Sequence, residues 1–258
     1  DFEKGEMIPD ETIKTDIANQ HDYIEWNQSI VDLDSLNGQS QKDGVENNLI
    51  ERMRAFGYTT ETMQFMLLPL VSELRDPLGS MGNDAALACL SDKPRLLFDY
   101  FKQLFAQVTN PAIDSIREEV IMSLECLIGP EGNLLENNKN NVRRLRVINP
   151  ILSNKELSSI KEISIGHWRT KTIDLTYEKK DGLKGMLSRL DEVCLEAQSA
   201  IEQNYSFIVL SDKRVSDSRM SLSSLLSCSS VHHHLTKKQL RTKIGIVIET
   251  GEAREVHH

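Results

Sequence analysis

The fold is decided by three short apolar runs in the last third of the sequence: TIDLTY at residues 172–177, YSFIVL at 205–210 and KIGIVIE at 243–249. Each run has the length and apolar content of a buried β-strand. The two segments between them, 183–203 and 220–235, carry apolar side chains at helical spacing. An alternation of strand and helix with near-continuous apolar strands predicts parallel pairing and right-handed crossovers.

The same unit occurs in doubly wound sheets and in β/α barrels, and periodicity alone does not separate the two. We therefore predict an α/β fold built of βαβ units with mainly parallel strands. Residues 46–258 are expected to form one domain, because neither an internal repeat nor a linker of domain length interrupts them. Residues 1–45 are polar and mixed, and they are expected to form an extended or linking segment.

The N-terminal half of the domain is predicted to be rich in helix. Apolar side chains recur at helical spacing over 45–56, where Gly57 follows as a C-cap, and again over 60–70. A further helix is expected near 84–91, and a strongly amphipathic one over 96–108.

The middle of the chain gives mixed signals. Residues 113–127 fit a helix, or part helix and part strand, and residues 143–149 fit a short strand. Ser153, followed three residues later by Glu156, has the pattern of a capping box. This pattern predicts a helix that begins at this point.

Composition and charge exclude several classes of protein. Apolar residues make up 39% of the chain and charged residues 27%, as in ordinary folded proteins. The formal charge of −9, from 39 acidic and 30 basic residues, disfavours binding to nucleic acid and to anionic membranes. No apolar run is long enough to span a bilayer. The first residues resemble no signal peptide and lack an initiating Met, so we expect part of a longer, soluble, intracellular polypeptide.

The four cysteines give no sign of a metal or redox site. Cys89, Cys126, Cys194 and Cys228 stand more than thirty residues apart, and no C-x-x-C pair exists. A zinc ribbon or a thioredoxin-type motif is therefore disfavoured. Reduced thiols in apolar surroundings are the expected state, and they agree with an intracellular compartment.

Two candidate ligand sites have a simpler explanation. The glycine-bearing loop at 79–83 can present N–H groups to a phosphate, but it lacks the G-x-G-x-x-G spacing, so a tight turn is favoured. His232, His233 and His234 are consecutive and would point roughly 100° apart on a helix, so they do not converge on one ion. Imidazoles beside the free carbonyls of a helix C-terminus are the favoured interpretation.

The strand ends are the best physical indication of a functional surface. Ser211 and Asp212 follow one predicted strand, and Glu249 and Thr250 follow another, at the end where α/β proteins place their sites. Without a His or Lys nearby in the sequence, ordinary polar strand ends are the favoured interpretation. The chain contains no G-x-S-x-G, H-E-x-x-H or Walker motif, so the residues alone assign no catalytic group.

Several phrases, spread over nearly the whole chain, carry a further signal: GSMGND (79–84), LSDKPR (90–95), YFKQLFAQVTNP (100–111), IREEV (116–120), VHHHL (231–235), LRT (240–242) and ETGEAREVHH (249–258). Together they strongly resemble the central domain of the glutamate synthase family. The resemblance is densest between Gly79 and Glu125.

The resemblance implies a large enzyme that converts glutamine and 2-oxoglutarate to two glutamates. In that family an N-terminal cysteine releases ammonia, which passes through an internal tunnel to an FMN site in a β/α barrel. Electrons reach FMN through a 3Fe–4S cluster, from NAD(P)H with FAD or from ferredoxin. All of these groups lie outside the matching segment, so the resemblance implies no cofactor, no metal and no catalytic residue in this chain.

The implied role is that of a connecting domain with an α/β topology like an incomplete copy of the FMN barrel. Residues 1–45 correspond to the segment after the amidotransferase domain, and 46–258 to the central domain before the FMN barrel. Those two domains of the same polypeptide are therefore the expected partners. Thr109 and Asn110 are candidates for the ammonia tunnel or a domain boundary, because they end a predicted helix at a turn fixed by Pro111. A mere capping role for Thr109 is the alternative.

Two other functions stay open. An autonomous α/β enzyme would bind a phosphate ligand with the 79–83 loop and the strand ends at Asp212 and Glu249, and it requires a pocket there. A pure interaction module instead requires exposed apolar patches where other domains dock.

Overall fold

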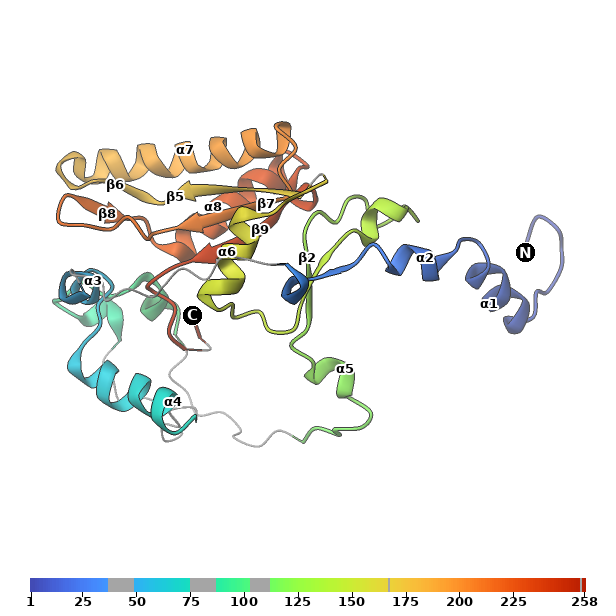
Figure 1. The fold of residues 1–258 in the computed structure, drawn as a ribbon, viewed down its shortest axis with the longest axis horizontal. Helices are drawn as coiled ribbons and strands as arrows, with labels where there is room; N and C mark the ends of the chain where they lie inside the picture. Colours follow the sequence, from blue (N-terminus) through green and yellow to red (C-terminus); the bar gives the residue numbers. More distant parts are fainter. Residues whose placement is uncertain (37–48, 75–86, 103–111, 167, 256) are drawn as a thin grey trace.

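The structure is a computed structural model that describes residues 1–36, 49–74, 87–102, 112–166, 168–255 and 257–258. It consists of an α/β body from which the N-terminal segment extends to one side (Figure 1). The 79–83 loop and the candidate residues Thr109 and Asn110 lie outside the described residues.

A four-stranded sheet forms the centre of the body. Its strands are β4 (Ser164–Ile165), β5 (Trp168–Asp174), β7 (Phe207–Ser211) and β9 (Gly245–Glu249), in the order β4-β5-β7-β9. The strands β5, β7 and β9 are parallel, and β4 is antiparallel to β5. The prediction of an α/β fold with parallel strands is therefore confirmed, and the sheets in the described part of the chain form no closed barrel.

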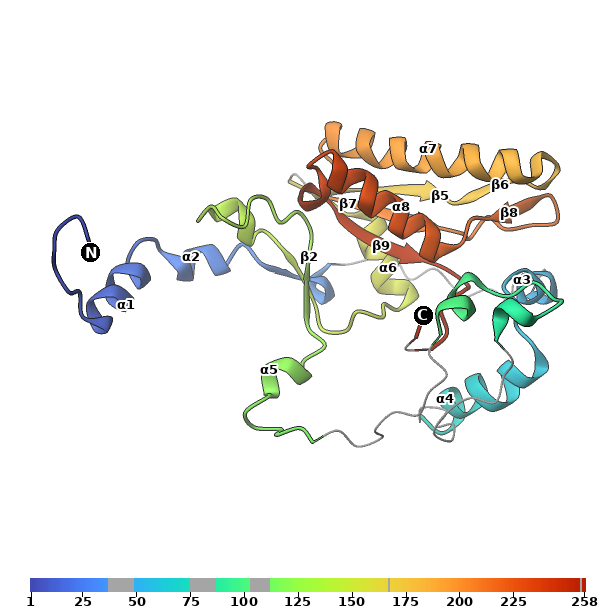
Figure 2. The same cartoon turned by 180° about the vertical axis from the view of Figure 1, so that it is seen from behind.

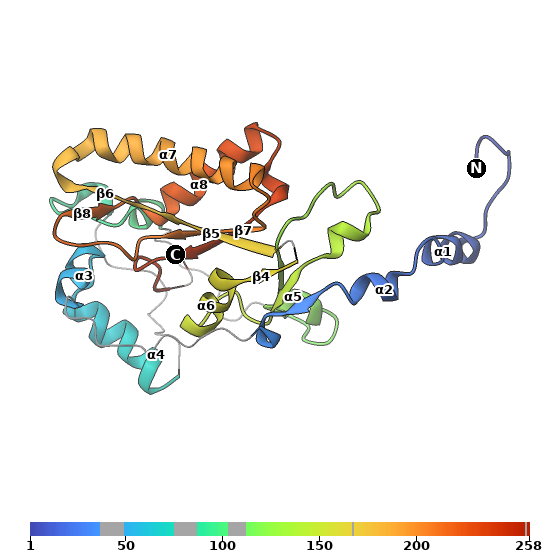
Figure 3. The ribbon, with the colours of Figure 1, turned by 45° about the horizontal axis from the view of Figure 1, so that its top comes forward.

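Two long helices cover one face of this sheet (Figure 3). The helix α7 (Gly182–Glu202) precedes β7, and α8 (Ser224–Lys237) precedes β9, as the βαβ pattern predicts. Their apolar faces and the side chains on this face of the sheet form one buried cluster. Its members include Ile173, Leu175, Val193, Ala197, Ile208, Leu210, Val231, Leu235 and Ile244.

The opposite face packs against a smaller sheet and one helix. The small sheet contains β1 (Val31–Asp32), β3 (Leu145–Val147) and β2 (Cys126–Ile128), in the order β1-β3-β2. The helix α6 (Asn154–Glu162) begins with the predicted capping box of Ser153 and Glu156. A second buried cluster joins these elements to the large sheet through Trp168 and Phe207, whose rings meet edge to face.

The helix predicted to begin at Met220 begins only at Ser224, so this boundary was wrong. Met220 lies in β8 (Arg219–Ser221), which pairs antiparallel with β6 (Thr176–Glu178) beyond the end of β5. The start of α8 is set by Glu252, whose carboxylate accepts the N–H of Ser224 at 2.7 Å. A cap that is 28 residues away in the chain leaves no local pattern in the sequence.

The N-terminal half contains short helical segments, which Figures 1 and 2 show apart from the two long helices. These are α1 (Asp10–Ala18), α2 (Tyr23–Asn27), α3 (Leu49–Ala55), a π-type helix (Thr62–Leu67) that continues into α4 (Leu68–Ser72), and α5 (Glu119–Met122). Short 3-10 turns lie at Leu33–Ser35, Ala88–Leu90, Leu97–Phe101, Lys139–Val142, Lys179–Asp181 and Arg241–Lys243. Gly57 has the positive φ of 66° that a C-cap requires.

Two predicted helices of this half are 3-10 turns where they are described. Of residues 87–91, the described part of the 84–91 prediction, only 88–90 are helical, and the turn at 97–101 ends in extended backbone at Lys102. Phe98 is buried, whereas Tyr100 and Phe101 stay 49% and 68% exposed. Since a helix depends on packing of its apolar face, this segment lacks the contacts that would hold an α-helix. The mixed prediction for 113–127 is confirmed by α5 followed by β2.

Candidate functional site at the strand ends

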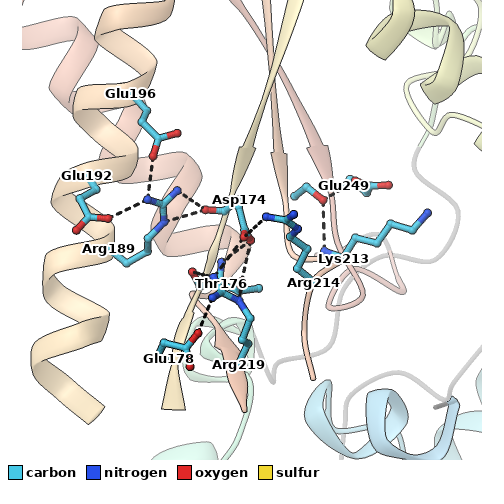
Figure 4. Close-up of polar contacts among 11 residues, drawn as sticks. Asp174, Thr176, Glu178, Arg189, Glu192, Glu196, Lys213, Arg214, Arg219 and Glu249 are labelled. Carbon is cyan, nitrogen blue, oxygen red and sulfur yellow. Dashed lines mark hydrogen bonds and ion pairs between the residues drawn. The ribbon is translucent and has the colours of Figure 1, made fainter. Parts of the chain in front are cut away.

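The carboxyl ends of the three parallel strands bring polar residues into one row. Asp174 of β5 is in register with Ser211 of β7, and Ser211 is in register with Glu249 of β9. The sequence placed Ser211 and Glu249 at strand ends, and their contact is direct, because the Ser211 hydroxyl donates to the Glu249 carboxylate at 2.5 Å. Figure 4 shows this edge with the charged side chains that gather around it.

Glu249 is held by a lysine of α6, the helix on the face of the sheet opposite α7 and α8. The ammonium group of Lys161, on α6, lies 2.7 Å from the same Glu249 oxygen. Burial raises the pKa of Glu249, but the hydrogen bonds from Lys161 and Ser211 outweigh it, so the net pKa is lowered. This partner could not be inferred from the sequence, because Lys161 is 88 residues away from Glu249 in the chain.

Asp212 is a buried carboxylate that holds the loop after β9. Only 1% of Asp212 is exposed. It accepts hydrogen bonds from the Thr250 hydroxyl at 2.5 Å and from the Gly251 N–H at 3.1 Å. The pKa of Asp212 is raised to about 6, mainly by burial, while the two hydrogen bonds lower it and the nearby carboxylates of Glu252 and Glu249 add to the rise.

Asp174 is the centre of an arginine network on the other side of the row (Figure 4). Arg219 reaches the Asp174 carboxylate at 3.3 Å, the Thr176 hydroxyl at 2.8 Å and the Glu178 carboxylate at 2.8 Å. Arg214 contacts the same Asp174 oxygen at 3.4 Å from a more exposed position. These bonds fix the β6–β8 pair against the end of β5.

Arg189 connects this network to α7. Its guanidinium donates twice to the backbone carbonyl of Asp174, at 3.0 and 2.7 Å, and it pairs with Glu192 and Glu196. Burial lowers the pKa of Arg189, but the two glutamates more than offset this and the net pKa is raised. An open cleft of about 830 Å³ lies over these residues.

The arrangement is a set of mutual ion pairs and hydrogen bonds that anchor the loops following each strand. Asp174 and Glu178 are paired with Arg219, Glu249 is paired with Lys161, and Asp212 is bonded to Thr250 and Gly251. Three carboxylates, Asp212, Glu249 and Glu252, gather where β7 and β9 end, and they would repel a phosphate. Within the described ranges, no group of three or more His, Cys, Asp or Glu side chains is arranged to hold a metal ion.

The histidine run does not form a joint site. His232 accepts a hydrogen bond from Arg241 at 3.1 Å, and His234 bonds to Gln198 of α7 at 3.0 Å, while His233 is exposed. Two of the three rings therefore bind separate partners near the end of α8. Cys89, Cys126, Cys194 and Cys228 are free thiols, and burial raises the pKa of Cys194 and Cys228.

Comparison with known proteins decides the family. The family model described as the glutamate synthase central domain matches residues 51–258. The chain belongs to the glutamate synthase central domain family. It is 42% identical to a "Glutamate synthase [NADH]" of Schizosaccharomyces pombe and 43% identical to a "Glutamate synthase [NADPH] large chain" of Bacillus subtilis. It is 35% identical to a "Ferredoxin-dependent glutamate synthase" of Antithamnion sp..

The relatives are much longer than this glutamate synthase central domain chain. All of the chain is matched in each of these three, but it spans only 13% of the Schizosaccharomyces pombe protein and 17% of the other two. The resemblance that the sequence motifs suggested is thereby confirmed. In the described part of the chain, every helix is too short or too polar to cross a membrane.

Arg219 and Arg214 bind the same carboxylate and offer a matched test of the network. Arg219→Met is expected to lower the free energy of unfolding by about 2 kcal/mol, because it removes the donor to the buried Thr176 hydroxyl and one of the two arginine partners of Asp174. Arg214→Met, at a side chain that is 76% exposed, should change it by less than about 0.5 kcal/mol. Urea denaturation of both variants checks this, and equal effects would contradict the assigned roles.

Proposed function

We propose that this chain is the connecting domain of a glutamate synthase polypeptide, a scaffold between a glutaminase site and a flavin site. The observation that carries the proposal is family membership over residues 51–258, combined with a span of only 13–17% of the relatives. The parent reaction is then glutamine, 2-oxoglutarate and reductant to two glutamates. The likeness of the fold to an incomplete FMN barrel is part of this proposal.

The bonding at the strand ends supports a scaffold over an autonomous phosphate-binding enzyme. In the described residues the carboxylates and arginines of this edge bind one another, and the acidic group at β7 and β9 opposes a phosphate. FMN, the 3Fe–4S cluster and the sites for NAD(P)H, FAD or ferredoxin would accordingly lie elsewhere in the polypeptide. The relatives are named as NADH, NADPH or ferredoxin-dependent, so the electron donor varies within the family.

Exposed apolar side chains support docking to other domains. The segment around α5 projects from the body (Figures 1 and 2). Its large apolar residues are between 53% and 87% exposed: Ile116, Val120, Ile121, Met122 and Leu124. Exposure of this kind marks a surface that is covered in an assembly. The amidotransferase and FMN-barrel domains of the same polypeptide are the partners we propose.

The C-terminal segment joins the two halves of the chain, as a scaffold requires. Arg254 donates to the backbone carbonyls of Phe56 and Gly57. Glu255 pairs with Lys102 at 2.7 Å, and His257 bonds to the carbonyl of Phe98 at 2.9 Å. The loops after β9 are thereby tied to the N-terminal half.

The ammonia path is tested through Thr109, which with Asn110 remains our candidate for a tunnel or domain boundary. In the full-length polypeptide, Thr109→Val is expected to uncouple the two half-reactions, because an apolar side chain would disturb the passage of ammonia. The molar ratio of glutamine hydrolysed to 2-oxoglutarate consumed should then rise above one. Thr12→Val, at an exposed position of α1, is the matched control. Unchanged stoichiometry in Thr109→Val would reject the tunnel role.

A further inference from the structure

An apolar groove of about 760 Å³ runs along the outer edge of β9. All residues from Ile246 to Thr250 line it. Consecutive residues of a strand point to alternate faces of the sheet, so a groove that touches each of them must follow the edge of the strand. β9 is the terminal strand in the order β4-β5-β7-β9, and this edge has no neighbouring strand among the described residues.

The backbone of β9 offers hydrogen bonds along this groove. The N–H of Gly245 donates to Ser206, and the carbonyl of Glu249 accepts from Asp212, so the odd-numbered residues of β9 face β7. In a parallel ladder the alternate residues face the other way. The N–H and C=O groups of Ile246 and Ile248 therefore point away from β7, beyond the edge of the sheet and into the groove.

Apolar residues line both sides of the groove, as they do on the two faces of a strand inside a parallel sheet. On one side lie Leu225 and Cys228 of α8, and on the other lie residues of β2, β3 and α6. Ile246 packs toward the cluster under α7 and α8, and Val247 packs toward the opposite cluster. A strand placed in this groove would have both of its faces against apolar side chains, which is the environment of an interior strand of an α/β sheet.

A buried imidazole at the groove also lacks a hydrogen-bond partner, although the Glu255 carboxylate lies 3.9 Å from its Nδ1. His258 lines the groove, its side chain is 4% exposed, and neither ring nitrogen has a hydrogen-bond partner among the described residues. Buried polar atoms in folded proteins are nearly always bonded. An incoming segment with a polar group would complete this site.

We propose that the groove receives an apolar β-strand from the part of the same polypeptide outside residues 1–258, added parallel to β9. The order β5-β7-β9 already adds each successive parallel strand on the same side, and a further strand continues that series. Backbone hydrogen bonds to Ile246 and Ile248 give the affinity, and the apolar walls select a strand that is apolar on both faces. The inference rests on the proposed function only in placing the chain within a longer polypeptide.

Amide exchange within β9 tests the proposal with an internal control. In the full-length polypeptide, hydrogen exchange with single-residue resolution should show Ile246 and Ile248 protected to within about tenfold of Val247, whose N–H faces β7. If Ile246 and Ile248 exchange more than about a hundredfold faster than Val247, no strand is paired at this edge and the proposal fails.

Two isoleucines at opposite edges of the same sheet provide a matched pair of variants. Ile248 on β9 is 43% exposed, and Ile165 on β4 is 59% exposed. In the full-length polypeptide, Ile248→Lys should raise the rate of limited proteolysis about tenfold, because it places an ammonium group in the apolar slot. Ile165→Lys should leave that rate unchanged. Equal rates for both variants would overturn the proposal.

These measurements are independent of the stoichiometry test for the ammonia path. Protection of Ile246 and Ile248 with unaltered coupling in Thr109→Val keeps the added strand and rejects the tunnel assignment. If Thr109→Val uncouples the half-reactions while Ile246 and Ile248 are unprotected, the tunnel assignment is kept and the added strand is rejected.

Discussion

Phe207→Ala is expected to lower the free energy of unfolding by about 3 to 5 kcal/mol. Phe207 is fully buried in β7 and belongs to the cluster that joins the large sheet to the small one. Its ring meets Trp168 edge to face, with 6.4 Å between the ring centroids. Removing the ring deletes this contact and leaves a cavity between the two sheets, which close packing does not readily refill.

Two glycines show how closely the sheets meet at this ring. A Cβ atom added at Gly245 would lie 3.0 Å from the Phe207 ring and 3.2 Å from the backbone of Gly129. Gly129 follows β2 with a φ of 129°, a conformation that side chains rarely adopt. The backbone around Phe207 is thus already at contact distance. It has little room to collapse into the space that an alanine would leave.

Urea denaturation of the 258-residue protein measures this loss, with Phe65→Ala as the matched control. Phe65 is 68% exposed, so its truncation should change the free energy of unfolding by less than about 0.5 kcal/mol. A loss below about 1 kcal/mol for Phe207→Ala would mean that the two sheets are not held together at this ring.

The parallel part of the large sheet was predictable because its strands leave local patterns. The bounds of one strand were wrong, since the predicted run 172–177 covers only the end of β5 and continues into β6 of another sheet, and β4 was not predicted. The run at 205–210 covers most of β7, whose residues are all buried, and the run at 243–249 is apolar on both faces although Ile248 stays 43% exposed at the sheet edge. This apolar content indicates parallel strands. The capping box of Ser153 and Glu156 is likewise local, and it was predicted correctly. Short-range chemistry that agrees with the tertiary fold is what a single sequence can report.

The partners at the strand ends were only half predictable. The sequence predicted that Ser211, Asp212, Glu249 and Thr250 follow strands, and the strand order of the structure brings Ser211 beside Glu249 and Asp212 beside Thr250. Lys161 and Arg219 come from elements whose contacts here depend on how distant segments pack. Sequence windows do not contain that information, and Arg219 lies where a loop before a helix was expected rather than a strand.

The N-terminal half was harder because its apolar residues are not all buried. The amphipathic pattern at 96–108 predicts a helix only if its face packs on a core. Where the structure describes this segment, Tyr100 and Phe101 are exposed and the backbone forms a 3-10 turn. An amphipathic pattern whose apolar face contacts another domain looks the same in the sequence as one whose apolar face packs on the core.

Asp212→Asn is expected to gain stability relative to the wild type as the pH rises. The pKa of Asp212 is raised to about 6 from its usual 3.8. Between pH 4 and 6 the folded state therefore holds a proton that the unfolded chain has released. The stability that this proton contributes is complete below about pH 4 and is lost as the pH rises through about 6. A shift of this size corresponds to about 2 to 3 kcal/mol.

The asparagine removes the charge and keeps most of the contacts. Its carbonyl can accept the Gly251 N–H, and its amide can donate to the Thr250 hydroxyl, which then needs another acceptor for its own proton. The loss of that one hydrogen bond lowers the free energy of unfolding of the variant by about 1 kcal/mol at every pH, which offsets part of the gain. The pH-dependent part of the difference is unaffected by this constant.

The measurement is the free energy of unfolding of both proteins between pH 4 and pH 7.5. Glu249, whose pKa is lowered, acts in the opposite direction and loses its contribution on acidification, but it is common to both proteins and cancels in the difference. Asp217→Asn, at an exposed aspartate in the loop before β8, should follow the wild type across this range. A difference for Asp212→Asn that stays constant would show that Asp212 is ionised in the folded protein throughout. The carboxylate would then be stabilised in its charged form by the Thr250 and Gly251 bonds.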